Sequence, residues 1–365
     1  MTVLDVYTAT GPISLDTGAS LVVDGAASAT VTTVSLDEAA ASFDVAGSAT
    51  FNGNGGGVTT TAGATMTVAG TVIVDATNVD FAASTTMSGT VEINAARSAT
   101  FSGGIVTNGG GATFDGQGAG TGTVSFSGAV SGDGLAIFNV GASVAAGGSV
   151  DVDVFEVDVA ASVDIDGSVS SNTAATIEGS VVINSGGSLT LDGLTDLADE
   201  GLIDVSASGS LTIQGDVNAD ATQATITASA NSDVDIDVSG ATGASADISA
   251  VFVAEQSSTT TVTGTVTFER STVFGGSLTG SGSVVLSSSN ANIQTHEVSG
   301  SVSVGTLTVD ATASVLVDGF ASTTTDVVVD GGSVVVEGEV EVSFGSLELK
   351  VFFLFIFWVG CFSAH

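Results

Sequence analysis

Residues 187–193, GSLTLDG, begin with a small residue and a hydroxyl residue, continue with alternating apolar and polar residues, and end in glycine. Alternation with a period of 2 predicts a β-strand with one buried and one solvent-facing side, and the glycine can turn the chain because it tolerates a positive φ. The same pattern recurs at 19–25 (ASLVVDG), 41–47 (ASFDVAG), 64–70 (ATMTVAG), 161–167 (ASVDIDG), 209–215 (GSLTIQG), 313–319 (ASVLVDG) and 332–338 (GSVVVEG). One structural unit is therefore copied along most of the chain.

The distance between copies predicts how they are arranged. Copies start at 19, 41, 64 and 83, at 187, 209, 234 and 258, and at 294, 313 and 332. This spacing fits three short strands and three turns, which form one coil of a solenoid whose strands pair with their equivalents one coil away. We therefore predict an all-β fold, an elongated β-solenoid (parallel β-helix) of roughly 16 coils of about 19–25 residues.

Three details of the chain refine this prediction. Shorter copies start at 97, 110 and 122, either because two strands form a coil there or because consecutive faces of one coil carry the pattern. The segment 194–200 (LTDLADE) has the best helical signal, for one or two turns at most. We expect a stack of inward rings from Phe43, Phe51, Phe101, Phe114, Phe126 and Phe138, and outward polar side chains at Asp44, Thr67, Asp164, Thr190 and Thr212.

The repetitive body, 1–349, is predicted to be one domain, and the tail, 350–365, differs from it in composition. Residues 351–365 (VFFLFIFWVGCFSAH) hold the only Trp and the only Cys, so the body has no disulfide and no cysteine metal site. The apolar run is too short to span a bilayer unaided, which leaves a short anchor or sorting signal, a cap on the last coil, or an artefact of the gene model. Residues 1–18 have neither the positively charged start nor the apolar run of a signal peptide, so we expect that the chain is a piece of a longer protein or that the gene model begins inside the repeats.

The charge limits the partners of the protein. Forty Asp and Glu stand against three Lys and Arg, a net charge of −37. Such a surface repels phosphate, which argues against nucleic acid and against anionic membranes, so any membrane contact would be made through the tail. Self-repulsion on this scale favours a saline or calcium-containing medium, although the acids also simply keep a Val-rich β protein soluble.

Acidic side chains gather in strand-like stretches. Asp233, Asp235 and Asp237 share one side of a strand, as do Asp151 with Asp153 and Asp164 with Asp166. Carboxylates on stacked coils can hold calcium, so Asp233, Asp235 and Asp237 are candidates for weak calcium binding; the alternative is a solvated face. The calcium-roll repeat and the EF-hand loop are absent from the sequence, and no other cofactor is predicted.

Threonines also alternate, at Thr259, Thr261, Thr263, Thr265 and Thr267. Thr-x-Thr arrays resemble the faces of ice-binding solenoids, but the copies here are irregularly spaced, and β-propensity explains the threonines as well. The glycine-rich segments 53–57 and 116–122 lack the lysine of a phosphate-binding loop and are predicted turns.

No catalytic signature is present. The body contains one histidine, His296, and two arginines, Arg97 and Arg270, with no nucleophile motif beside them. We therefore predict that the protein is not an enzyme, with a carbohydrate-active β-helix that uses paired carboxylates as the alternative.

Segments 126–135 (FSGAVSGDGL), 201–215 (GLIDVSASGSLTIQG) and 274–286 (FGGSLTGSGSVVL) resemble the passenger repeats of bacterial autotransporters and of filamentous-haemagglutinin-type adhesins. The resemblance implies a right-handed β-helix rod at the cell surface. We therefore expect a non-catalytic extracellular or cell-surface solenoid with a structural or adhesive role, whose partners are a host surface, a glycan, a matrix component or neighbouring repeats. A calcium- or salt-dependent surface-layer matrix protein is a further alternative.

Overall fold

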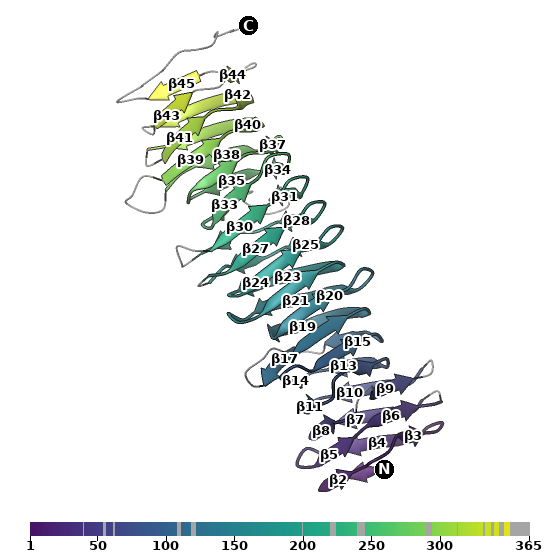
Figure 1. The fold of residues 1–365 in the computed structure, drawn as a ribbon. Helices are drawn as coiled ribbons and strands as arrows, with labels where there is room; N and C mark the ends of the chain where they lie inside the picture. Colours follow the sequence, from purple (N-terminus) through teal and green to yellow (C-terminus); the bar gives the residue numbers. More distant parts are fainter. Residues whose placement is uncertain are drawn as a thin grey trace. The chain divides into compact units, whose positions relative to one another are not determined.

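The computed structural model describes residues 1–38, 40–53, 56–60, 63–107, 111–117, 122–198, 200–219, 224–238, 245–288, 294–311, 313–330, 333–336, 339–342 and 347–350. All regular structure within these residues is β, as predicted (Figure 1). The chain divides into two compact units, Met1–Asn172 and Thr173–His365, and the division falls within β23 (Ser168–Ile177). The tail, 351–365, lies outside the described residues.

Each coil contains three strands, as the length of the repeat predicted. In the first unit β4, β5 and β6 follow one another, and each pairs in parallel with the strand three places later: β4 with β7, β5 with β8 and β6 with β9. The coil therefore has three faces, which we number in chain order. Faces 1 and 2 belong to one sheet and face 3 to another.

The strands of the first unit fall on these faces as follows. Face 1 contains β1 (Thr2–Val3), β4 (Ser20–Val23), β7 (Ser42–Val45), β10 (Thr65–Val68), β13 (Ser84–Met87) and β16 (Ile105–Thr107). Face 2 contains β2 (Val6–Thr8), β5 (Ser28–Val31), β8 (Ser48–Phe51), β11 (Thr71–Val74), β14 (Thr90–Asn94) and β17 (Ala112–Gln117). Face 3 contains β3 (Ile13–Leu15), β6 (Thr33–Leu36), β9 (Gly57–Thr60), β12 (Val79–Phe81), β15 (Ser98–Phe101), β18 (Thr123–Phe126), β20 (Gly141–Val144) and β22 (Ser162–Ile165). Two longer strands, β19 (Ala129–Asn139) and β21 (Ser149–Val157), run from face 1 into face 2.

The second unit repeats this arrangement. Face 1 contains β25 (Ser188–Leu191), β28 (Ser210–Ile213), β31 (Asp233–Asp237), β34 (Thr259–Thr263), β37 (Ser277–Thr279) and β44 (Glu339–Val342). Face 2 contains β26 (Leu194–Asp196), β29 (Val217–Asn218), β32 (Ser245–Ile248), β35 (Thr265–Phe268), β38 (Ser283–Leu286) and β45 (Leu347–Lys350). Face 3 contains β24 (Ser180–Ile183), β27 (Leu202–Val205), β30 (Thr225–Ala228), β33 (Val251–Ala254), β36 (Thr272–Phe274), β39 (Gln294–Val298), β41 (Ala313–Val317) and β43 (Ser333–Val336). The long strands β40 (Ser301–Asp310) and β42 (Phe320–Asp330) run from face 1 into face 2.

Strand register shows how far the coil length varies. In the first unit the shortest coil joins Phe126 to its partner Val144 on face 3. In the second unit the longest coil joins Val217 to its partner Ile248 on face 2, and it includes 239–244, which lie outside the described residues. The coil from Phe126 to Val144 is shorter than the predicted range of about 19–25 residues, and the coil from Val217 to Ile248 is longer. The predicted range of coil lengths is therefore too narrow at both ends.

The register also decides one open alternative and corrects two local predictions. The short copies at 97, 110 and 122 lie on faces 3, 2 and 3, and β16 on face 1 lies between the first two, so the coil keeps three strands and the two-strand alternative is wrong; only the copies at 110 and 122 lie on consecutive faces. Val234 pairs with Leu211, so the copy equivalent to 209–215 begins at 232 and not at 234. The segment 194–200 begins with strand β26 instead of a helical turn, because Thr195 pairs with Ala175 before it and Val217 after it.

Phenylalanine rings fill the interior of the first unit. All six predicted rings are buried, and Phe81 and Phe155, which the prediction omitted, are buried with them. Neighbouring rings in this group have centroids 4.7 to 6.3 Å apart. The second unit has a smaller cluster, Phe252, Phe268 and Phe274. The five polar residues expected outside are partly or fully exposed, which confirms the predicted sides of their strands.

The corner between faces 3 and 1 is built from left-handed residues that stack from coil to coil. Gly186, Ser208, Asn231 and Ser257 have φ values of 84°, 65°, 63° and 73°. The Ser208 N–H donates to the carbonyl of Asn231 at 2.8 Å, and the Asn231 N–H donates to that of Ser257 at 3.1 Å. These hydrogen bonds offset part of the strain that positive φ imposes on non-glycine residues.

Candidate functional site

The outward side of face 1 in the second unit carries hydroxyl groups on successive coils. The strands β25, β28, β31, β34, β37 and β40 pair in this order, so equivalent outward residues form two columns along the coils. We call this surface the hydroxyl face; it consists of Ser188, Thr190, Ser210, Thr212, Thr259, Thr261, Thr263, Ser277, Thr279, Ser301 and Ser303, together with Asp233, Asp235 and Asp237.

The spacing of the hydroxyl face follows from β geometry. Neighbouring strands lie about 4.8 Å apart, and outward residues along one parallel strand are about 6.6 Å apart, so the columns form a nearly rectangular array. Ser277 Oγ and Ser301 Oγ are 3.0 Å apart and share a hydrogen bond between coils. Arg97, Arg270 and Lys350 are the only Lys and Arg of the chain, and none of them belongs to this surface.

The structure places Asp233, Asp235 and Asp237 together on the outward side of β31, as predicted, but it does not stack them on other acids. Asp233 lies between Ser210 and Thr259, and Asp235 between Thr212 and Thr261. Burial, and then the charge of Asp237, raise the pKa of Asp235 above its usual value. Within the described part of the chain no three Asp, Glu, His or Cys side chains are gathered so that they could hold a metal ion. Calcium binding here stays a prediction.

The other two acidic pairs also lie beside polar neighbours in the first unit. Asp151 is exposed, pairs with Ser131 and accepts a hydrogen bond from Asn172 Nδ2 at 3.0 Å. Asp164 is exposed and pairs with Ser143 on the preceding coil. Asp153 and Asp166 are likewise at least partly exposed.

The threonine run 259–267 is divided between two faces. Thr259, Thr261 and Thr263 point outward from β34 on face 1, and Thr265 and Thr267 point outward from β35 on face 2. Gly264, at a φ of 92°, turns the chain between them. The serine and threonine columns were not predicted from the sequence, because their members lie about one coil apart along the chain. The signal that could have found them is the hydroxyl residue at the second position of many copies.

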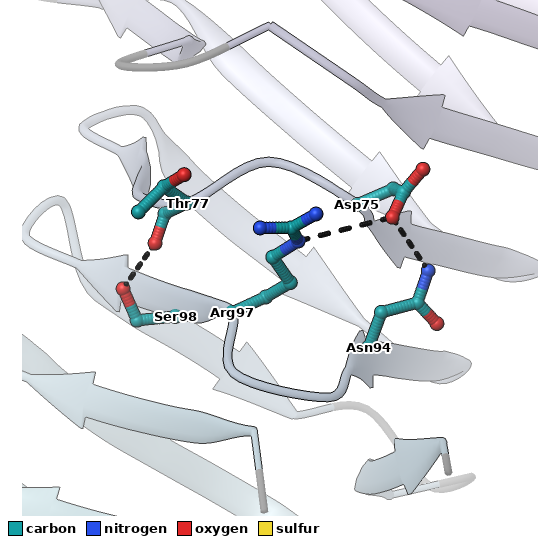
Figure 2. Close-up of polar contacts among 5 residues, drawn as sticks. All are labelled: Asp75, Thr77, Asn94, Arg97 and Ser98. Atoms are coloured by element: carbon teal, nitrogen blue, oxygen red, sulfur yellow. Dashed lines mark hydrogen bonds and ion pairs between the residues drawn. The ribbon is translucent and has the colours of Figure 1, made fainter. Parts of the chain in front are cut away.

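The arginines have structural partners. Arg97 Nε lies 3.9 Å from Asp75 Oδ1, which also accepts a hydrogen bond from Asn94 Nδ2 at 3.0 Å (Figure 2). Both members of this ion pair are more than a third exposed, so it contributes little stability. Arg270 in the second unit donates from Nη2 to the carbonyl of Ala219 at 3.0 Å.

The remaining candidates do not form a surface site. His296 lies on the inner side of β39 and is fully buried. Gly53, Gly56 and Gly122 lie beside strands, as expected of turns, whereas Gly57 begins β9 and Gly116 lies within β17. Residues 54–55 and 118–121 of the two glycine-rich segments lie outside the described residues.

None of the described residues forms a helix with the length and hydropathy needed to cross a membrane. Comparison of the chain with protein-family models, with curated proteins and with solved structures finds no match. The hydroxyl face is therefore interpreted from its own chemistry.

Proposed function

We propose that the protein is a non-catalytic, extracellular or cell-surface solenoid with a structural or adhesive role, similar in kind to the passenger repeats of autotransporters and filamentous-haemagglutinin-type adhesins. The observation that carries this proposal is the hydroxyl face, where six consecutive coils present polar side chains at one spacing, with hydroxyl groups on five of them and aspartates on β31. A surface of this kind binds through many weak, equivalent contacts along a repeating partner.

The chemistry of the face selects the class of partner. Serine and threonine hydroxyls donate and accept hydrogen bonds, and the three aspartates only accept them when ionised. The net charge of −37 repels polyanions such as sulfated glycans. We therefore propose a neutral, hydroxyl-rich linear polysaccharide as the partner, lying along the columns. Two coils span about 9.6 Å, close to the repeat of an extended β-1,4-linked disaccharide.

The test is binding to insoluble cellulose and chitin, with heparin beads as the polyanion that should not bind. Three substitutions together, Thr212→Val, Thr261→Val and Thr279→Val, remove hydroxyls from the face while they keep side-chain shape and β-propensity. If each hydroxyl contributes about 1 kcal/mol, the affinity falls roughly 100-fold.

The matched control carries Thr225→Val, Thr267→Val and Thr308→Val, which remove as many outward hydroxyls from faces 2 and 3. The control should bind as the unmodified chain does. Equal loss in both triple variants, or no binding of the unmodified chain to either polysaccharide, would contradict the adhesive part of the proposal.

A second candidate is a calcium- or salt-dependent matrix protein, and Asp235 favours it. The raised pKa of this carboxyl reflects its burial first and then repulsion from the charge of Asp237. A cation at β31 would relieve that repulsion. This candidate predicts that the melting temperature rises more in millimolar calcium than in sodium chloride of equal ionic strength, with EDTA as the reference.

A further inference from the structure

His296 occupies an inward position that a threonine and a valine fill in the neighbouring coils. It points inward from β39 on face 3, where it pairs with Thr272 of β36 and Val315 of β41. Its side chain is fully buried, as are those of Thr272 and Val315. A titratable ring therefore lies in the core of the second unit, away from the hydroxyl face.

The two ring nitrogens of His296 have different surroundings. Nε2 lies 3.1 Å from the carbonyl oxygen of Ser287, which follows strand β38. Because a carbonyl can only accept, Nε2 carries the hydrogen and donates it. Nδ1 is then the acceptor nitrogen of the neutral ring, and it is buried with no hydrogen-bond partner among the described residues.

No charged group among the described residues is placed to stabilise a protonated ring. The buried polar side chains of this part of the chain are those of serine, threonine and His296 itself. The charged residues on the strands and turns around β39 lie at the surface of the second unit. Glu297 faces outward from β39, Glu269 and Arg270 lie in the turn before β36, and Asp310 ends β40.

The carboxylate of Asp310 interacts with Ser287, the residue whose carbonyl oxygen accepts the hydrogen bond from His296. Its Oδ2 accepts a hydrogen bond from Ser287 Oγ at 3.1 Å, so it contacts the residue that His296 holds and not the ring. Ser287 is thus joined to β39 through its carbonyl and to β40 through its hydroxyl. The hydrogen bond from His296 therefore connects the end of β38 to β39.

We infer that His296 makes one coil of the second unit sensitive to acid: protonation of its ring at mildly acidic pH causes local unfolding of the coil between β38 and β41. A proton added at Nδ1 creates a buried cation with a donor that has no acceptor, and such a group destabilises the folded coil until it reaches water. A solenoid opens locally because each coil contacts only its neighbours.

The direction of the pH effect distinguishes protonation of His296 from protonation of the many acidic side chains. Burial lowers the pKa of His296 below the usual 6.5, so the unfolded chain binds the proton first and stability falls as the pH drops below 6.5. Protonation of surface carboxylates acts in the opposite direction, because it reduces the net charge of −37.

The experiment compares the full chain with His296→Leu and His296→Gln by urea unfolding between pH 7.5 and 5.0 at constant ionic strength. The unfolding equilibrium constant of the second unit should rise by up to tenfold per pH unit below 6.5 in the unmodified chain, and this rise should vanish in both variants. The hydrogen-exchange protection factors, which correct for the slower intrinsic exchange at acidic pH, should fall in 284–317 at pH 5.5 and stay unchanged in 181–213. His365→Gln is the matched control, because it removes the other histidine of the chain.

Two results would overturn the inference. One is an equal pH dependence in the unmodified chain and in His296→Gln, or its loss in His365→Gln. The other needs no variant and so does not depend on whether a substituted core folds: NMR titration of the histidine rings in the unmodified chain. A ring of His296 that titrates at or above 6.5 without any change in the protection factors of 284–317 would show that the core accepts the charge.

Discussion

Phe81 and Phe101 pair in register on neighbouring coils of face 3, with ring centroids 4.7 Å apart and ring planes inclined by 19°. Phe101 also contacts Phe114 at 5.8 Å and Phe126 at 5.9 Å. The ring of Phe101 therefore joins faces 2 and 3 inside the first unit, and its neighbours cannot collapse onto the space it would leave without breaking their own contacts.

Replacing this ring should be costly. We expect Phe101→Ala to lower the free energy of unfolding of the first unit by about 3–5 kcal/mol, because it removes apolar burial and leaves a cavity between stacked rings. Urea unfolding measures the loss. Phe101→Leu, which keeps much of the volume, should cost clearly less; similar losses for the two variants would argue against a packed ring stack.

Thr260 offers a substitution that should stabilise the second unit. It is inward on β34 between Val234 and Leu278, 1% exposed, and its Oγ1 has no hydrogen-bond partner among the described residues. Thr260→Val keeps the shape and removes the buried hydroxyl, so the free energy of unfolding should rise by about 1 kcal/mol. Thr261→Val, on the outward side of the same strand, is the control and should change it little; a destabilised Thr260→Val would contradict this account.

Gly70 lies where turns of successive coils touch. A Cβ at this position would overlap the carbonyl oxygen of Gly47 on the preceding coil, whereas a Cβ on Gly25 would meet nothing within 4 Å. Gly70→Ala should therefore destabilise the first unit by about 1–3 kcal/mol through overpacking, and Gly25→Ala should be close to neutral. Thermal unfolding of the two variants side by side tests the close approach of the turns.

Asp235 should limit stability at neutral pH. Its pKa is raised in the folded state, so the folded chain binds a proton more readily than the unfolded chain, and the contribution of this group to stability increases as the pH falls toward 3.8. Asp235→Asn should raise the melting temperature at pH 7 and flatten this part of its pH dependence. Asp164→Asn removes the same charge from an exposed position on β22 in the first unit and should have a smaller effect; equal shifts would indicate a general charge effect.

The sequence predicted the elements of the fold better than their placement. Alternation at 187–193 correctly assigned Leu189 and Leu191 to the core, because the side of a strand follows directly from residue parity. Six buried rings of the first unit were found in the same way, whereas Phe81 and Phe155 were missed. The helical reading of 194–200 failed because pairing of Thr195 with both neighbouring coils overrode a weak local preference.

The candidate site was harder to predict than the fold. Asp233, Asp235 and Asp237 were correctly placed on one side of one strand, since their spacing is 2. Their neighbours were not predictable, because copies differ in length and one residue of slip changes every partner across the coils. The serine and threonine columns on either side of β31 became visible only from the register.

The sequence by itself determined that this chain forms stacked, three-strand coils with a sealed apolar interior, because period-2 alternation and a repeat of about 20 residues leave few other ways to bury the apolar side. The tertiary structure decided which face each copy occupies. The copies at 187–193 and 313–319 share a pattern, yet β25 lies on face 1 and β41 on face 3. The physical reason is that faces are assigned by coil-to-coil hydrogen bonding and by the lengths of the turns, which sum along the chain and are not encoded in any one copy.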